Sequence, residues 1–279
     1  MDKKETKLDS RKFMKNKENL VNRYLAHIST KGYSCYTIQN RKWILQEFLK
    51  NFAIPDKDSV YKFIEKERWN KNSKAQIVYV LRAFGEWIVK EYNINFNTPS
   101  SLQQPKRIPT YLSNDEVMNL RNACKKIRDK AIIDMLLFTG IKPSELYNLD
   151  INDVNLKSGT INIIEKEKNK RELPINKILK NTLQSYVQWR EIHTHSNALF
   201  ISNRGTRLSK MEIYATIVRR AKNAGIDKKI SPHTLRHTFA VLLMQNKTDI
   251  SMIQKLLGHK NPKTTAIYTH LSEQAKKNN

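Results

Sequence analysis

The chain has 279 residues, of which 39% are hydrophobic, and this composition predicts a folded protein with a core. Lysine and arginine number 51 against 26 acidic residues, and the resulting net charge of +25 predicts a polyanionic partner, nucleic acid before an anionic membrane. No apolar run is long enough to cross a bilayer and the first residues lack the hydrophobic core of a signal peptide, so we expect a cytoplasmic protein.

The N-terminal third of the chain predicts a small helical bundle. Residues 1–16 are rich in lysine and are expected to form a flexible basic N-terminus. Residues 17–94 are expected to form one domain with basic residues on its exposed faces, and Ser34 is a plausible N-cap for its second helix. Apolar residues at helical spacing predict helices within 18–30, 34–52, 58–68 and 72–92.

A change of composition marks the end of this domain. Residues 95–110 contain Pro99, Pro105 and Pro109, polar residues and no amphipathic period, which is typical of an extended linker. We therefore expect a second domain over residues 111–279.

The second domain predicts helices around one small sheet. Ser113 and Glu116 form the pattern of a capping box at a helix start, and an apolar helix over residues 128–139 is expected to end at Gly140. Alternating residues around Ile161 and Leu173 predict a β-hairpin with a charged turn, and the chain after it reads as helical.

The stretch SPHTLRHTF, residues 231–239, carries the strongest candidate for a functional cluster. As a helix it places His233, Arg236 and His237 at positions i, i+3 and i+4. Zinc is disfavoured because Thr234 follows the first histidine where a metalloprotease has glutamate, and Cys35 and Cys124 are distant and fit no metal or disulfide pattern. An ordinary helix start with Ser231 as N-cap remains open, but an anion site at that start also accounts for the arginine.

Four further stretches join this cluster in a fixed order. FTGIKPSELYNLDINDV lies upstream and IIEKEKNKRELPI covers the hairpin, while LLGH and TTAIYTH follow HTLRH. Over residues 111–271 this set resembles the tyrosine recombinases, also called the phage-integrase family, and most of all their Xer-type members. The resemblance implies a mainly α fold with a small β-sheet: an N-terminal helical, SAM-like core-binding domain that clamps DNA, and a mixed α/β catalytic domain.

The resemblance also implies a role for each matching residue. Tyr268 matches the nucleophile that forms a 3′-phosphotyrosyl bond with DNA, and Arg236 matches a phosphate-clamping arginine. His233 matches the general acid/base, and His259 matches the histidine that binds a non-bridging oxygen. Aligned on Pro174, Lys166 matches the lysine that protonates the 5′ leaving oxygen, with Lys168 and Lys170 as alternatives. Because cationic side chains stabilise the developing charge, we expect no metal and no cofactor.

Lys142 departs from the family pattern, which has arginine at this position. Lysine keeps the charge but loses the planar fork that holds two phosphate oxygens, and a rate loss of ~10²–10³ is the expected consequence. Glu145 either orients Lys142 or simply occupies a favourable place in the first turn of a helix, and the second reading is favoured.

The resemblance and the charge together imply double-stranded DNA as the partner. A short tail after Tyr268 is expected to dock into a neighbouring subunit, giving dimers on a site and a tetramer in synapsis. Xer-like resolution and mobile-element integration both remain open, as does an attenuated DNA-binding relative that has lost the chemistry; a type IB topoisomerase uses similar residues. Candidate phosphate contacts are Arg41, Lys42, Lys74, Arg82, Arg107, Arg204, Arg207, Lys210, Arg219 and Arg220.

Overall fold

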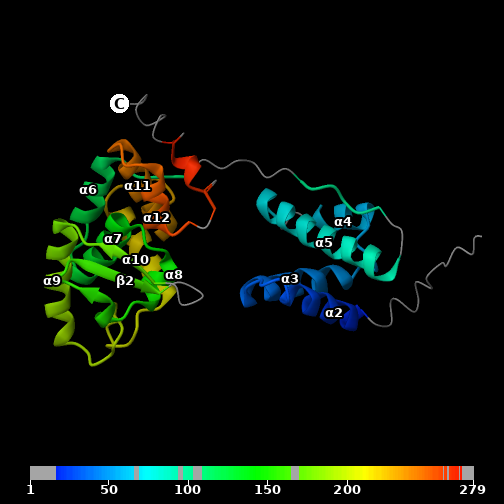
Figure 1. Ribbon diagram of the computed structural model, residues 1–279, viewed down its shortest axis with the longest axis horizontal. Helices are drawn as coiled ribbons and strands as arrows, with labels where there is room; N and C mark the ends of the chain where they lie inside the picture. Colours follow the sequence, from blue (N-terminus) through cyan, green and yellow to red (C-terminus); the bar gives the residue numbers. More distant parts are fainter. Residues whose placement is uncertain are drawn as a thin grey trace, which may run out of the picture. The chain divides into compact units, whose positions relative to one another are not determined.

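The chain folds as two compact units, residues 1–107 and 108–279. The structure, a computed structural model, describes residues 17–65, 69–93, 97–102, 109–164, 170–259, 261–262, 264–269 and 271. Helices make up most of both units, and a small sheet lies in the second (Figure 1). The predicted fold class, mainly α with one small sheet, is confirmed.

The N-terminal unit is a bundle of four described helices around an apolar core. Side chains of Ser34, Asp56 and Asn70 cap three of them by accepting a hydrogen bond from a backbone N–H three residues on. The N-cap predicted at Ser34 is confirmed. The core is rich in aromatic rings, among them Tyr24 and Phe84, whose centroids lie 5.1 Å apart. The helices are α2 (Lys17–Ser29), α3 (Cys35–Leu49), α4 (Lys57–Ile64) and α5 (Lys71–Tyr92).

Part of the segment expected to be a linker lies against this bundle. The Lys57 backbone N–H donates to the Asn97 carbonyl over 2.8 Å, and Pro99 is buried. The described residues 97–102 contain no helix or strand, as their composition indicates.

The C-terminal unit contains the sheet and the remaining helices. Its first helix begins with the predicted capping box between Ser113 and Glu116. The elements are α6 (Asn114–Asn122), α7 (Ile127–Thr139), α8 (Pro143–Asn148), η1 (Ile151–Asp153), β1 (Val154–Asn155), β2 (Thr160–Ile164), β3 (Lys170–Pro174), α9 (Lys177–Glu191), α10 (Lys210–Asn223), α11 (Pro232–Gln245) and α12 (Ile250–Leu257).

The three strands pair in the antiparallel order β1-β2-β3. The hairpin predicted from the alternating pattern is confirmed, with Ile161 opposite Leu173. The sequence did not predict β1, because two residues are too few to establish an alternating pattern.

Helix α7 lies at the centre of the unit, against α9 and α11 (Figure 1). Nearly all of its side chains are buried, and it ends at Gly140 as predicted. Gly140 adopts a φ of 61°, and a Cβ at this position would lie 2.3 Å from Cδ1 of Phe239 on α11. A residue without a side chain is therefore needed where the two helices meet.

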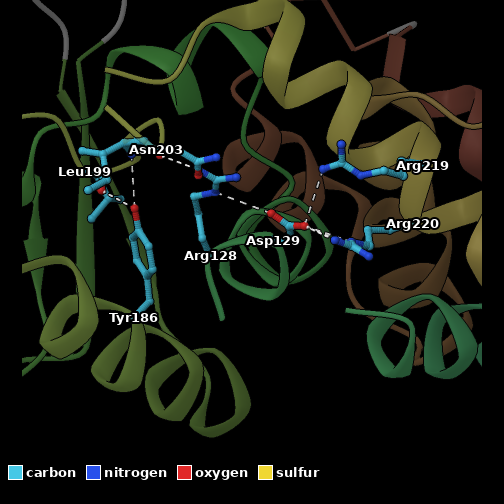
Figure 2. A network of polar contacts seen from close by, with 8 residues as sticks. Arg128, Asp129, Tyr186, Leu199, Asn203, Arg219 and Arg220 are labelled. Carbon is cyan, nitrogen blue, oxygen red and sulfur yellow. Dashed lines mark hydrogen bonds and ion pairs between the residues drawn. The ribbon is translucent and has the colours of Figure 1, made fainter. Parts of the chain in front are cut away.

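A buried carboxylate holds α7 to α10. Asp129 has no exposed surface and accepts hydrogen bonds from Nε and Nη2 of Arg220, over 2.9 and 2.6 Å. Arg128 Nε and Arg219 Nη2 lie 3.5 and 3.8 Å from the same carboxylate, which Figure 2 shows at the centre of three guanidinium groups. Arg128 also donates to Asn203 over 3.0 Å, so the network connects α7 both to α10 and to the loop before α10.

Candidate active site

The start of α11 presents the candidate cluster. Ser231 caps the helix by accepting from the Thr234 N–H over 3.2 Å, and Pro232 occupies the first helical position, as predicted. His233 lies exposed in the first turn. Arg236 and His237 follow one turn later and point into the unit, so the helix start brings a histidine from the surface next to an interior arginine and histidine.

Arg236 is held by the ends of two other helices. Only 5% of its surface is exposed, and its guanidinium donates to the carbonyl of Gly140, at the end of α7, and to that of Leu257, at the end of α12. Gly140 and Gly258 have φ values of 61° and 65° and terminate these helices. Helix C-termini carry partial negative charge, which stabilises a buried cation at this point.

Tyr268 lies in the helical residues 264–269 and is 1% exposed. Its hydroxyl is 2.8 Å from Nδ1 of His237, and its ring stacks on that of His259 at a centroid distance of 6.4 Å. Burial raises the pKa of the Tyr268 hydroxyl, and the charge of Arg236 opposes this rise only in part. The phenol is therefore protonated at neutral pH and hydrogen-bonded inside the cluster.

The two histidines next to Tyr268 are neutral. Burial, together with the neighbouring His233 and Arg236, lowers the pKa of His237 to about 4. Burial and the charges of Arg236 and Lys142 lower the pKa of His259 to about 4 as well. The ring of His259 is fixed by a 2.8 Å contact between its Nδ1 and Oγ1 of Thr265. Each neutral ring therefore has one unprotonated nitrogen, which can accept a hydrogen bond or a proton.

Lys142 is the N-cap residue directly before α8 and is anchored by Glu145. The Lys142 N–H donates to Oε2 of Glu145 over 2.8 Å, and its Nζ lies 3.2 Å from Oε1. Two nitrogens of Arg171, on β3, bind the same carboxylate over 3.1 and 2.9 Å. Burial alone would raise the pKa of Glu145, but the hydrogen bonds from Arg171 and Lys142 and their charges lower it. Glu145 caps the helix start, as the favoured reading has it, and it also binds the Lys142 ammonium, so both readings of this side chain apply.

The structure therefore brings Tyr268, Arg236, His237 and His259 into one cluster, with the charge of Lys142 acting on His259. Lys166 and Lys168 lie outside the described residues, and Lys170 is exposed at the start of β3. Sequence reasoning placed His237 near the cluster but did not assign it the tyrosine contact. It missed Arg171, whose partner Glu145 is 26 residues away and leaves no local signal.

Two of the arginines considered as DNA contacts are buried, and their side chains contact other residues of the protein. Arg41 is 4% exposed and lies 4.2 Å from the ring centre of Tyr33, while Arg220 is 8% exposed and bound to Asp129. Each stabilises the fold, because a buried guanidinium needs an acceptor or an aromatic face.

The other candidates differ in exposure and partners. Arg82 lies 2.7 Å from Glu86, and Arg207 binds Asp150 and the Tyr147 carbonyl. Arg107 lies outside the described residues. Lys74 is half-buried, and the exposed side chains are Lys42, Arg204, Lys210 and Arg219.

The described residues also bear on other kinds of function. Within them, no group of three histidines, cysteines or acidic residues is placed to hold a metal ion. None of the described helices is long and apolar enough to span a bilayer.

Comparisons with known proteins identify the family of this chain. Residues 110–275 match the model of the phage integrase family. Tyrosine recombinase XerC of Thermodesulfovibrio yellowstonii is 34% identical, and the alignment covers 92% of this chain and 93% of that protein. Two solved structures share the fold. One is the XerH site-specific recombinase bound to a palindromic difH substrate, after cleavage (TM-score 0.76, 23% identity, 95% of this chain and 83% of that one). The other is a lambda integrase tetramer bound to a Holliday junction (TM-score 0.73, 17% identity, 95% and 81%).

Proposed function

Since this chain belongs to the phage integrase family and is a tyrosine recombinase of Xer type, we propose that it cuts and rejoins duplex DNA through a covalent bond between a 3′-phosphate and Tyr268. The observation that carries this proposal is the position of the Tyr268 hydroxyl, 2.8 Å from His237 and within the field of Arg236. A phenol held among cationic and basic groups has what attack on a phosphodiester requires.

The cationic groups of the cluster bind and polarise the scissile phosphate in this proposal. Arg236 is already fixed by two carbonyls, so it needs no reorganisation when charge develops on the phosphate. Lys142 adds a second cation, and His259 donates a hydrogen bond to a non-bridging oxygen. His233 lies at the exposed edge, where the resemblance implies an acid/base role beside the phosphate, and Lys166 protonates the 5′ oxygen that leaves.

Cleavage preserves the energy of the broken phosphodiester bond in the new phosphotyrosyl linkage. The 5′ hydroxyl of a partner strand then attacks the same phosphorus and releases Tyr268, so rejoining requires no nucleotide cofactor. The charge of +25 supports duplex DNA as the substrate. Exposed Lys42, Arg204, Lys210 and Arg219 are the best placed of the basic candidates to contact its backbone.

The test is covalent capture on duplex DNA that carries a nick close to the cleavage point. The short fragment released by cleavage diffuses away, so the protein stays joined to the DNA. A randomised duplex library supplies the site, and the recovered duplexes then serve as defined substrates. We expect a denaturation-resistant adduct with the wild-type chain and none with Tyr268→Phe, which keeps the ring; no adduct with any duplex would refute the proposal.

Assembly through the C-terminal tail is part of the proposal. We infer that the segment after Leu271 docks on a second copy, which links dimers on a site into a synaptic tetramer. A chain truncated after Leu271 should bind DNA but assemble less on it, and unchanged assembly would contradict this role.

An attenuated enzyme is the second candidate, and Lys142 is the observation that favours it. Its ammonium is paired with Glu145, a carboxylate that also binds Arg171, so part of its charge is already used. Lys142→Arg restores the planar fork, and we expect cleavage to rise by ~10²-fold if lysine holds back an otherwise intact site. An unchanged rate would indicate a site adapted to lysine. We propose resolution of chromosome dimers in the cytoplasm as the biological role, rather than integration of a mobile element, because the sequence motifs most resemble those of Xer-type recombinases.

A further inference from the structure

We propose that His237 is a catalytic residue of this recombinase, and that its Nδ1 takes the proton of Tyr268 as the phenol oxygen attacks the DNA phosphorus. The inference rests on the proposed function and deepens it. The family resemblance assigns acid/base chemistry to His233, the first histidine of the HTLRH stretch, and gives His237 no role.

The geometry favours His237 over His233 for this proton. Nδ1 of His237 lies 2.8 Å from the Tyr268 hydroxyl, and it is the hydroxyl's only hydrogen-bond partner among the described residues. Tyr268 is 1% exposed, so solvent has almost no access to its hydroxyl. His233 is one turn earlier on α11 and exposed, and within the described part of the chain no hydrogen bond joins it to Tyr268.

The charge state of His237 suits a proton acceptor. The groups that act on its ring are His233 and Arg236 of the same helix, and Tyr268 and His259 of the segment packed against it. Burial and the neighbouring His233 and Arg236 keep the imidazole neutral, with a pKa of about 4. In the tautomer that carries the ring proton on Nε2, the unprotonated Nδ1 accepts the hydrogen bond of the phenol, and the proposed transfer uses this tautomer.

The same groups keep the nucleophile inactive until DNA binds. A base with a pKa of about 4 does not ionise a phenol whose pKa is raised above its ordinary value of about 10, so the proton stays on Tyr268. A phosphodiester at Arg236 brings a negative charge that offsets the guanidinium and makes the adjacent imidazole more basic. Arg236, which binds the phosphate, and His237, which binds the phenol, are thus adjacent on α11, so proton transfer is coupled to substrate binding.

The step balances as follows. The O–H bond of Tyr268 breaks and its proton moves to Nδ1 of His237, while the phenol oxygen forms a bond to phosphorus. The bond from phosphorus to the 5′ oxygen breaks, and that oxygen receives a proton from the acid assigned above to Lys166. In rejoining, the 5′ hydroxyl gives its proton to Lys166 as its oxygen bonds to phosphorus, the bond from Tyr268 to phosphorus breaks, and His237 returns the proton to the phenol.

The test measures single-turnover cleavage of a nicked duplex recovered by covalent capture. We expect His237→Ala to slow cleavage by ~10²–10⁴-fold, the usual contribution of general acid–base catalysis. His237→Asn keeps a hydrogen-bonding side chain of similar size but cannot take the proton, so it should be slowed to a similar extent. DNA affinity equal to that of Tyr268→Phe shows that each variant is folded.

Two readouts separate proton transfer from simple positioning. The rate of His237→Ala should increase in proportion to hydroxide concentration, whereas the wild-type rate should level off once His237 is unprotonated in the complex. Added imidazole should restore part of the activity of His237→Gly and leave the wild-type rate unchanged.

Several outcomes would overturn the inference. Wild-type rates in His237→Ala would exclude any role in cleavage, and recovery of full activity in His237→Asn would reduce His237 to a positioning residue. In both cases the wild-type chain forms the adduct and the recombinase proposal stands. If the wild-type chain forms no adduct on any captured duplex, the recombinase proposal fails and this inference fails with it.

Discussion

Gly140 connects the fold to the candidate site, so Gly140→Ala is an informative perturbation. This residue ends α7 with a φ of 61°, and its carbonyl accepts a hydrogen bond from Arg236. A Cβ here would lie 2.3 Å from Cδ1 of Phe239 and 2.8 Å from Cδ2 of Leu257. Both atoms belong to buried side chains of the core around Tyr268, so they have little room to move.

The expected loss of stability is the sum of two effects. An L-residue in the left-handed conformation costs ~1–2 kcal/mol. Overpacking of a filled core costs a further ~1–3 kcal/mol, which gives ~2–5 kcal/mol in total. Gly225→Ala is the matched control, because Gly225 has a φ of 69° but nothing within 4 Å of its would-be Cβ, and it should lose only ~1–2 kcal/mol.

Native-state amide hydrogen exchange measures this loss locally, in α7 and α11, without assuming that both units unfold together. We expect the free energy of opening in these helices to fall more in Gly140→Ala than in Gly225→Ala. Equal losses in the two variants would refute the argument that close approach of α7 and α11 requires glycine at position 140.

Further predictions concern the buried charges. Asp129→Asn leaves Arg220 buried without its counter-charge, and we expect the free energy of unfolding in chemical denaturation to fall by ~3–5 kcal/mol. Arg219 is exposed and lies 3.8 Å from the carboxylate, so Arg219→Ala should lower it by only ~0–1 kcal/mol. Similar losses in the two variants would contradict the assigned network. The pKa of His259 is about 4 when folded and ~6.5 when unfolded, so the unfolded chain binds more protons between these values and stability should fall as the pH drops through them. His259→Asn should flatten this part of the curve of melting temperature against pH, and an unchanged slope would show that other groups cause it. Glu145, with its lowered pKa, should contribute stability above the unfolded value of ~4.3 that is lost as the pH falls further, and Glu145→Gln should remove that dependence.

Local signals made much of the catalytic unit predictable. Ser231 and Pro232 establish where α11 begins, and Gly140 establishes where α7 ends, because caps and left-handed residues depend on near neighbours in sequence. The hairpin around Ile161 was predictable for the same reason, since alternation has a period of two residues.

Partners that are distant in sequence were not predictable. Arg171 and Glu145 lie 26 residues apart, and Arg220 and Asp129 lie 91 apart, so only the folded chain brings each pair together. An arginine count alone does not tell a buried guanidinium such as Arg220 from an exposed one such as Arg219. The hydrogen bond from Tyr268 to His237 spans 31 residues and was hidden for the same reason.

The most direct test of the whole account is to locate the covalent bond in the captured adduct by mass spectrometry after protease and nuclease digestion. The account predicts a nucleotide attached through its 3′-phosphate to the peptide that contains Tyr268. A nucleotide on another tyrosine, such as the nearby Tyr111, or attachment through a 5′-phosphate, would contradict it.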